Sequence, residues 1–225
     1  ETALTSKNPK IKRVMDSIEN YQVQIRYTQI DRRNDSVIFT DYDFQVDDSN
    51  YFYPASTVKF PTAVLALERL NNIDTLTMGT KYYVEGDTIE STFKKDVSEI
   101  FAVSDNLANN RLVELLGFED INTTLRKKGI TPVRISHRLG QHSDDLRTKP
   151  LIIYLNDSTT GITKSILNKP PLELNLLNRT KGSAYYEDDI LITEPFDFSS
   201  KNYFPISSQH NLLKRVIFPQ NFDKS

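Results

Sequence analysis

The feature that most constrains this chain is the run of residues 60–70, which is apolar on almost every side of a helix. A helix of this kind is packed within a core on most of its faces. Ser56 and Lys59 stand where the helix is expected to begin, and residues three apart lie on one helix face about a turn from each other. We therefore expect Ser56 Oγ and Lys59 Nζ to lie close together, with Lys59 mostly buried. Pro61 fits a helix only in its first turn, so the opening turn should be tight or irregular.

Ser56 and Lys59 form a pair that could carry out nucleophilic chemistry. A serine hydroxyl attacks a carbonyl only with help from a base within hydrogen-bond reach. A lysine can be that base when desolvation or a neighbouring cation lowers its pKa. The N-terminus of a helix adds a partial positive charge and free backbone N–H groups, which stabilise a developing oxyanion. Ser91 and Lys94 share the spacing, but they lie in a polar stretch that opens no apolar helix, so the sequence favours Ser56 as the nucleophile.

A second motif, Ser104-Asp105-Asn106, lies between two stretches that are expected to be helical. On its own, such a string is typical of an ordinary helix N-cap or turn. Ser-x-x-Lys followed by Ser-Asp-Asn, however, resembles the serine β-lactamase and penicillin-binding protein superfamily, and most closely its class A-like branch. The resemblance extends over about residues 8–140.

The resemblance implies a role for each motif residue. By similarity Ser56 would be the acylated nucleophile and Lys59 its base partner. Ser104 would relay a proton toward the leaving group, and the side chain of Asn106 would hold the amide carbonyl of the substrate. Asp105 is interpreted as structural, because an aspartate in such a turn usually accepts hydrogen bonds from nearby backbone amides. The resemblance also implies an α+β fold of the α/β-sandwich type, with an all-α lobe and an antiparallel sheet.

The apolar patterns agree with the opening order of that fold, which is a helix, a strand hairpin and the nucleophile helix. The expected helices span residues 8–20, 107–117, 118–128 and 211–217, and Gly117 closes the second of them. The expected strands span residues 21–27 and 36–42 with a turn at 31–35, and residues 152–155 and 189–193 could also be strands, with a turn at 156–161. Residues 1–140 are predicted to contain the N-terminal strands and the all-α lobe, and residues 141–225 a divergent insertion followed by a helix.

One feature of class A enzymes that does not appear in its usual form is the Glu-x-x-Leu-Asn loop, whose glutamate activates water to hydrolyse the acyl-enzyme. The nearest string, residues 171–175, has Pro171 at the position of that base. Residues 134–140 resemble the start of the loop, yet no glutamate follows. The side chains that remain as candidate bases are His137, His142, Asp144 and Asp145, although a histidine in a polar loop is more often solvated. The deacylating group therefore stays open, and with it efficient lactam hydrolysis.

The Lys-Thr-Gly strand is also absent; in the family it lines the site and usually supplies the second oxyanion-hole amide, after that of the nucleophile. Residues 159–161 (Thr-Thr-Gly) and 180–182 (Thr-Lys-Gly) share letters with it, but neither string is followed by a strand suited to a sheet centre. We expect the chain to be a fragment that lacks C-terminal sheet strands, or a partner chain to supply them. The bare edges of the N-terminal hairpin would then be prone to pair with another chain.

Composition argues against several classes of function. A net charge of −2 with dispersed lysines and arginines does not favour nucleic-acid binding, and no stretch is long and apolar enough to span a membrane. The chain has no cysteine for disulfides or thiolate sites, three scattered histidines and no Gly-rich phosphate loop, so we expect neither a metal nor a cofactor. The chain starts at Glu1, which suggests a removed leader and a periplasmic or extracellular location.

The leading hypothesis is a class A β-lactamase-like serine hydrolase that forms an acyl-enzyme on Ser56 with a lactam or a peptide amide. The alternative within enzymes is a penicillin-binding-type peptidase that acylates readily and deacylates slowly. The alternative outside enzymes is a catalytically inactive member that binds cell-wall peptides or another protein. The expected substrate is a small-molecule lactam or a cell-wall peptide.

Overall fold

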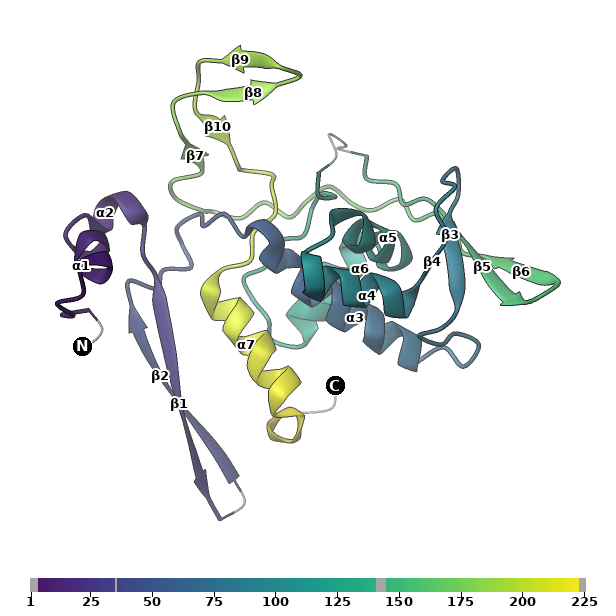
Figure 1. The fold of residues 1–225 in the computed structure, drawn as a ribbon, viewed down its shortest axis with the longest axis horizontal. Helices are drawn as coiled ribbons and strands as arrows, with labels where there is room; N and C mark the ends of the chain where they lie inside the picture. Colours follow the sequence, from purple (N-terminus) through teal and green to yellow (C-terminus); the bar gives the residue numbers. More distant parts are fainter. Residues whose placement is uncertain (1–3, 35, 141–144, 223–225) are drawn as a thin grey trace.

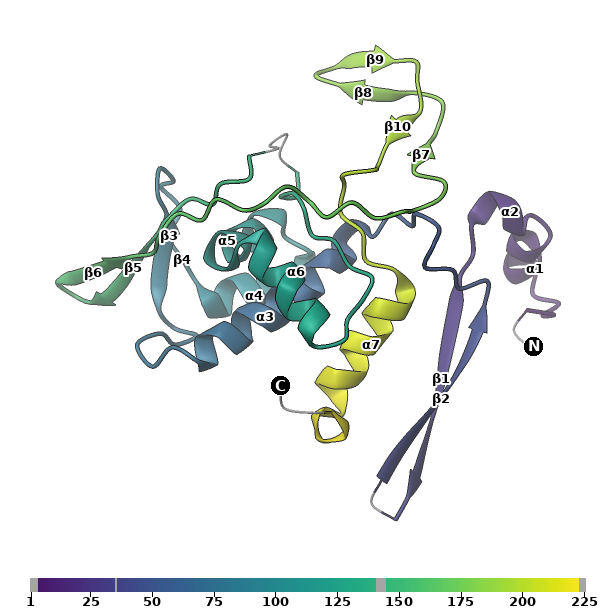
Figure 2. The same ribbon diagram turned by 180° about the vertical axis from the view of Figure 1, so that it is seen from behind.

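The computed structural model describes residues 4–34, 36–140 and 145–222. A block of helices forms the centre of the molecule, and three extensions project from it (Figures 1 and 2). They are a long N-terminal hairpin, an arm that carries short strands, and the outer end of a small sheet. None of the helices in these residues has the length and apolar character needed to cross a membrane.

The central block contains most of the buried apolar core. It consists of α3 (Lys59–Asn71), α4 (Phe93–Val103), α5 (Asn106–Leu116) and α6 (Phe118–Lys127). α5 packs against the other three helices and is buried at 8 of its 11 positions. Each fully buried apolar side chain such as Leu112 stabilises the fold by about 1.5–3 kcal/mol. Gly117, at a φ of +79°, ends α5 as expected. The core is therefore built around α5, the helix that follows Ser104.

The N-terminal residues form two short helices, α1 (Pro9–Met15) and α2 (Ile18–Tyr21). The expectation of one helix over residues 8–20 is therefore wrong. The break falls at Ser17, whose backbone (φ −132°, ψ 36°) is not helical.

The N-terminal hairpin consists of β1 (Ile25–Arg33) and β2 (Ser36–Phe44), which pair antiparallel. β1 starts four residues later than expected, because residues 18–21 are helical and Gln22 adopts a left-handed φ of 47°. Residues 31–33 pair within the strands and are not part of the turn. The hairpin is therefore longer and tighter than the alternating pattern indicates.

One face of the hairpin packs against α7 (Ile206–Ile217), a helix expected only from residue 211. Lys214 Nζ lies 2.6 Å from Asp41 Oδ1 across this contact. On the other face Tyr27 is 60% exposed. Within the described residues β1 and β2 pair only with each other. A short 3₁₀ helix, η2 (Pro219–Asn221), follows α7.

The small sheet has the strand order β4-β3-β5-β6. Its strands are β3 (Lys81–Val84), β4 (Ser91–Thr92), β5 (Leu151–Asn156) and β6 (Thr159–Ile162). β5 confirms the strand suggested at 152–155, whereas residues 159–161, expected in a turn, belong to β6. All pairs between the named strands are antiparallel and occur beside helices, which confirms the α+β class.

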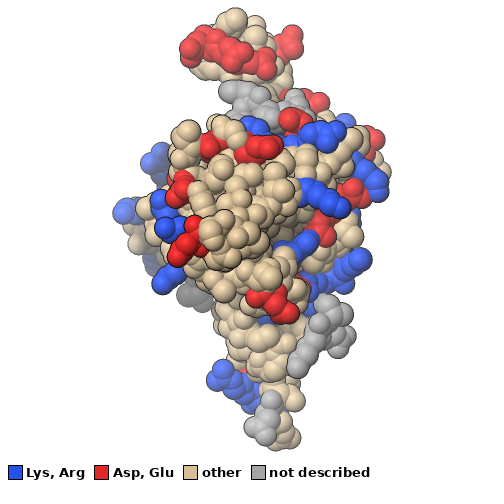
Figure 3. Space-filling model, turned by 90° about the vertical axis from the view of Figure 1, so that its right-hand side faces the viewer, with Lys and Arg blue, Asp and Glu red and all other residues tan. Residues whose placement is uncertain are grey.

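The arm consists of four short strands that pair as β7 with β10 and β8 with β9. They are β7 (Thr180–Lys181), β8 (Tyr185–Glu187), β9 (Ile190–Ile192) and β10 (Phe196–Asp197). β9 lies within the strand suggested at 189–193. Residues 182–200 contain no lysine or arginine, so the acidic side chains of the arm stand out at the top of Figure 3.

Arg134 forms hydrogen bonds to the chain on both sides of the arm and so connects the arm to the helical block. Its side chain is buried, with the residue 1% exposed. Its guanidinium donates to the carbonyl oxygens of Lys201 at 2.8 Å and of Leu172 and Phe198 at 3.3 Å each. Its backbone pairs with that of Tyr203. One cation therefore holds the chain before the arm and the chain after it.

Candidate active site

Ser56 lies in a short 3₁₀ helix, η1 (Ala55–Val58), which leads directly into α3. This confirms the irregular opening turn expected from Pro61. Ala55 has a φ of 45°, a left-handed conformation that costs a non-glycine residue about 1–2 kcal/mol and that clusters at functional sites. Ser56 itself is exposed, and its backbone N–H lies at the start of η1, where helical N–H groups have no intrahelical partner.

Lys59, the first residue of α3, connects the two sequence motifs. It is 2% exposed, as expected. Its Nζ lies 3.1 Å from Ser56 Oγ and 2.9 Å from Ser104 Oγ, and it also donates to the Ser104 carbonyl oxygen. Burial lowers the pKa of Lys59 below the usual 10.5, and the negative charge of Asp105 opposes this shift. Lowering the pKa favours the neutral amine, which is the form that can accept a proton from a serine.

Ser104 reaches Lys59 because the chain turns sharply between α4 and α5. It follows α4 in a left-handed conformation, with a φ of 56°. Asp105 then caps α5, and its Oδ1 accepts a hydrogen bond from the Ala108 N–H at 2.6 Å. This confirms the structural interpretation of Asp105. Asn106 is the first residue of α5 and is exposed.

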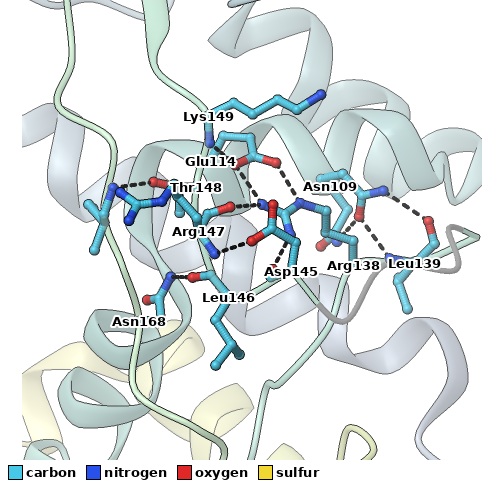
Figure 4. A network of polar contacts seen from close by, with 12 residues as sticks. Asn109, Glu114, Arg138, Leu139, Asp145, Leu146, Arg147, Thr148, Lys149 and Asn168 are labelled. Carbon is cyan, nitrogen blue, oxygen red and sulfur yellow. Dashed lines mark hydrogen bonds and ion pairs between the residues drawn. The ribbon is translucent and has the colours of Figure 1, made fainter.

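The segment after α6 is held against α5 by a buried ion pair (Figure 4). Arg138 Nε lies 2.6 Å from Glu114 Oε1, and both side chains are buried. The guanidinium also donates to the carbonyl oxygens of Asp145 at 2.8 Å and Arg147 at 2.9 Å. Glu114 Oε2 accepts from the Lys149 N–H at 2.8 Å. The ion pair therefore joins α5 to residue 138 and to residues 145, 147 and 149 of the segment that follows α6.

Asn110 brings the same segment beside Asn106. Its side-chain amide exchanges two hydrogen bonds with the Leu139 backbone, each 2.9 Å long. Gly140 follows with a φ of +66°, and a Cβ there would lie 2.9 Å from Asn106 Nδ2. Only glycine therefore leaves Asn106 in its place. Sequence reasoning missed Asn110, although it stands one helical turn after Asn106 on the same face, a spacing that could have indicated it.

The candidate bases for deacylation are only partly described. His137 is half-buried, and its Nδ1 lies 2.7 Å from the Arg138 carbonyl oxygen, to which it can donate. Asp145 is exposed, and its Oδ1 accepts from the Arg147 N–H at 2.8 Å. His142 and Asp144 lie outside the described residues.

The three strings that share letters with the missing family motifs lie elsewhere. Residues 171–175 contain neither helix nor strand. Residues 159–161 are in β6 and pair with β5. Residues 180–182 begin in β7, which pairs with β10. None of the three strings pairs with β1 or β2, so the described chain shows no equivalent of the Lys-Thr-Gly strand beside the hairpin.

Ser91, in the second Ser-x-x-Lys string, belongs to a buried polar network. Its Oγ donates to Asp96 Oδ1 at 2.6 Å, and the Tyr82 hydroxyl donates to the other oxygen of the same carboxylate. Asp96 also forms an ion pair with Arg111, 2.6 Å from Nη2 to Oδ1. Lys94 is exposed, and no described contact joins it to this network. The network is structural, because it joins β3 and β4 to α4 and α5 through buried side chains. No group of three His, Asp or Glu side chains in the described chain could hold a metal ion.

The comparisons with known proteins give one match. The model of a family described as "Beta-lactamase enzyme family" matches residues 8–164, a range that includes Ser56, Lys59, Ser104 and Asn106. No curated protein and no solved structure matches the chain.

Proposed function

The chain belongs to the beta-lactamase enzyme family, and from this premise we propose that it is a serine hydrolase that forms an acyl-enzyme on Ser56. Membership supports a hydrolase that acts on a small molecule. The observation that carries the finer proposal is the position of Lys59, whose buried Nζ lies within hydrogen-bond distance of both Ser56 Oγ and Ser104 Oγ. One amine is thus placed to serve the nucleophile and the leaving group in turn.

Acylation begins when Ser56 Oγ attacks the carbonyl carbon of a lactam or peptide amide and its proton passes to neutral Lys59 Nζ. The carbonyl oxygen becomes an oxyanion, for which the Ser56 N–H at the start of η1 is a donor. Asn106 donates from its side-chain amide to a second carbonyl of the substrate. The C–N bond then breaks, and the leaving nitrogen takes a proton from Ser104 Oγ, which Lys59 restores.

Deacylation is proposed to be slow. The segment that Asn110 holds beside Asn106 presents Leu139 and Gly140, and neither residue has a group that can activate water. Judged from the described residues beside Asn106, a penicillin-binding-type peptidase therefore fits this site better than a rapid lactamase of class A type. A lactam or cell-wall peptide is encountered outside the cytoplasm, so we also propose a periplasmic or extracellular location, which fractionation of the producing cells tests.

The test is the intact mass of the protein after incubation with benzylpenicillin. We expect a mass increase equal to one opened lactam, persisting for many minutes, and none in Ser56→Ala. Ser98→Ala, at an exposed position of α4, is the matched control and should form the adduct. Rapid turnover without an adduct would favour the lactamase, whereas neither adduct nor turnover would favour a catalytically inactive binding protein.

A further inference from the structure

A cavity of about 740 Å³ lies between the open end of the N-terminal hairpin and the base of the arm. Its size falls in the range of small-molecule and cofactor sites, about 300–1,000 Å³. We propose that it binds an extended, uncharged peptide segment of the substrate whose amide Ser56 attacks. This proposal rests on the proposed function, and it adds a second contact region for that substrate.

Amide side chains from separate parts of the chain line this cavity. They are Gln22, Gln24, Gln45, Asn50 and Asn178. A side-chain amide offers both donors and an acceptor, so it can complement the N–H and C=O groups of a peptide. Gln24 and Gln45 stand one position beyond the paired residues Ile25 and Phe44, on facing strands. Neither of their amides bonds to a described residue, although Gln24 is half-buried. These two amides are therefore available to a ligand.

The backbone at three of these positions is strained. Gln22, Gln45 and Asn178 have φ values of 47°, 51° and 53°, in the left-handed region that residues other than glycine rarely adopt. Such strain costs about 1–3 kcal/mol per residue and is typical of ligand sites. Three left-handed residues with amide side chains therefore lie in the wall of one cavity.

The wall carries charges of both signs, Lys181 as well as Asp47 and the exposed Glu19, so it selects no single charge and suits an uncharged ligand. Lys181 Nζ is held by Gln22 Oε1 at 3.2 Å. Asp47 accepts hydrogen bonds from Ser49 and Asn50, which lowers the pKa of its carboxyl. An oligosaccharide fits less well, because, among the aromatic rings in the cavity wall, Tyr51 is 2% exposed and Phe52 is half-buried, which limits stacking of sugar rings.

The cavity is close enough to Ser56 for one substrate to contact both. Phe52 lines the cavity and precedes Ser56 by four residues, which span at most about 14 Å. The ring of Tyr51 stacks on Phe198 at 5.0 Å, and Phe198 contacts the exposed ring of Tyr53 at 5.6 Å. A row of aromatic side chains therefore leads from the cavity to η1.

The test is a titration of ¹⁵N-labelled protein with N-acetyl-tetraalanine amide, followed by NMR. Because the probe contains peptide amides, the class of bond that Ser56 is proposed to attack, the titration and its variants use Ser56→Ala protein as the parent, so that binding does not depend on Ser56 chemistry. We expect saturable shifts of the side-chain NH₂ signals of Gln24 and Gln45. The double variant Gln24→Leu, Gln45→Leu should bind about tenfold more weakly, because it loses the hydrogen bonds of both amides. The matched control Gln29→Leu, on the same hairpin but outside the cavity, should bind as the parent does.

Shifts confined to other regions, or an unchanged affinity in the double variant, would overturn the proposal. Shifts with chitotetraose but not with the peptide would replace it with a glycan site. The backbone spectrum of the double variant shows separately whether it is folded. Failure of the proposed function has a different signature, since a protein without a Ser56 adduct could still show the peptide shifts.

Discussion

The chain contains two Ser-x-x-Lys strings. The structure buries the lysine of the first string and the serine of the second. In the first, Ser56 is exposed and Lys59 is 2% exposed. In the second, Ser91 is 4% exposed and Lys94 is exposed. The first pair is joined by a contact of 3.1 Å, whereas Ser91 donates to Asp96.

The comparison shows that the Ser-x-x-Lys spacing brings the serine and the lysine together only when both residues lie on one helical turn. Ser56 and Lys59 lie on one continuous helical turn, where residues three apart share a face. Ser91 lies in β4 and Lys94 in α4, so the same spacing sends their side chains apart. Burial therefore affects the lysine of the first string and the serine of the second. It favours the neutral amine of Lys59, whereas the buried hydroxyl of Ser91 donates a structural hydrogen bond to Asp96.

The largest expected effect is on the rate of Ser56 adduct formation, which should depend on Lys59 but not on Lys94. Lys59→Met should slow formation of the Ser56 adduct by about 10²–10⁴-fold, because it removes the proposed general base. Lys94→Met should change the rate by no more than about twofold, as for an ordinary exposed position. The rates are measured from the intact mass over time. Equal effects of the two variants would show that burial of the lysine does not distinguish the strings.

The next effect is on the free energy of unfolding, and it tests the buried network to which Ser91 of the second string belongs. Asp96→Asn should lower the free energy of unfolding by about 3–5 kcal/mol, because Arg111 would remain buried without its carboxylate. Asp74→Asn, at an exposed position, should stay within about 0.5 kcal/mol of the wild type. Urea unfolding followed by circular dichroism gives both values. A loss below about 1 kcal/mol would contradict a structural role for the network.

Ser91→Ala is expected to have a smaller effect on stability, about 1–3 kcal/mol, because one donor to the buried Asp96 carboxylate is lost. The rate of adduct formation should not change, whereas Ser56→Ala is expected to abolish it. Ser98→Ala is the matched control on stability. If Ser91→Ala reduced acylation of a fully folded protein, the separation of the two serines into structural and chemical roles would be wrong.

The last prediction concerns the pH dependence of acylation, in which burial shifts only the position of the plateau. The reactive form contains neutral Lys59, so below the pKa of this amine the rate should rise about tenfold per pH unit and then level off. Because burial lowers that pKa, the plateau should begin below pH 10.5. The Lys59→Met variant should lack this rise. Adduct formation measured from about pH 5 to about pH 10 checks the profile, and a rate that falls with pH would exclude a lysine base.

Local signals in the sequence were sufficient for the elements that surround Ser56. Pro61 indicated the irregular opening turn, Asp105 the cap of α5, and Gly117 its end. Each of these predictions depends on residues within one helical turn. The roles assigned to Ser104 and Asn106 stay predictions, although the structure places Ser104 Oγ beside Lys59 Nζ.

Other features depend on partners that are distant in the sequence or on the backbone. The break at Ser17 and the left-handed Gln22 have no local cue, because neither residue is a glycine or proline. The contact of Asn110 with Leu139 joins residues 29 positions apart. The expectation of an absent C-terminal set of strands and the division at residue 140 stay predictions.

The anchorage of the arm by Arg134 has a consequence for proteolysis. Asp188 and Asp189, both at positive φ, form the turn at the tip, and exposed tips of this kind are preferred sites of nicking. A cut there would divide the chain into two pieces, yet Arg134 grips carbonyl oxygens on both sides of the arm, at Leu172 and Lys201. The nicked protein should migrate as one particle with its helical block intact, and the pieces should separate only in denaturant.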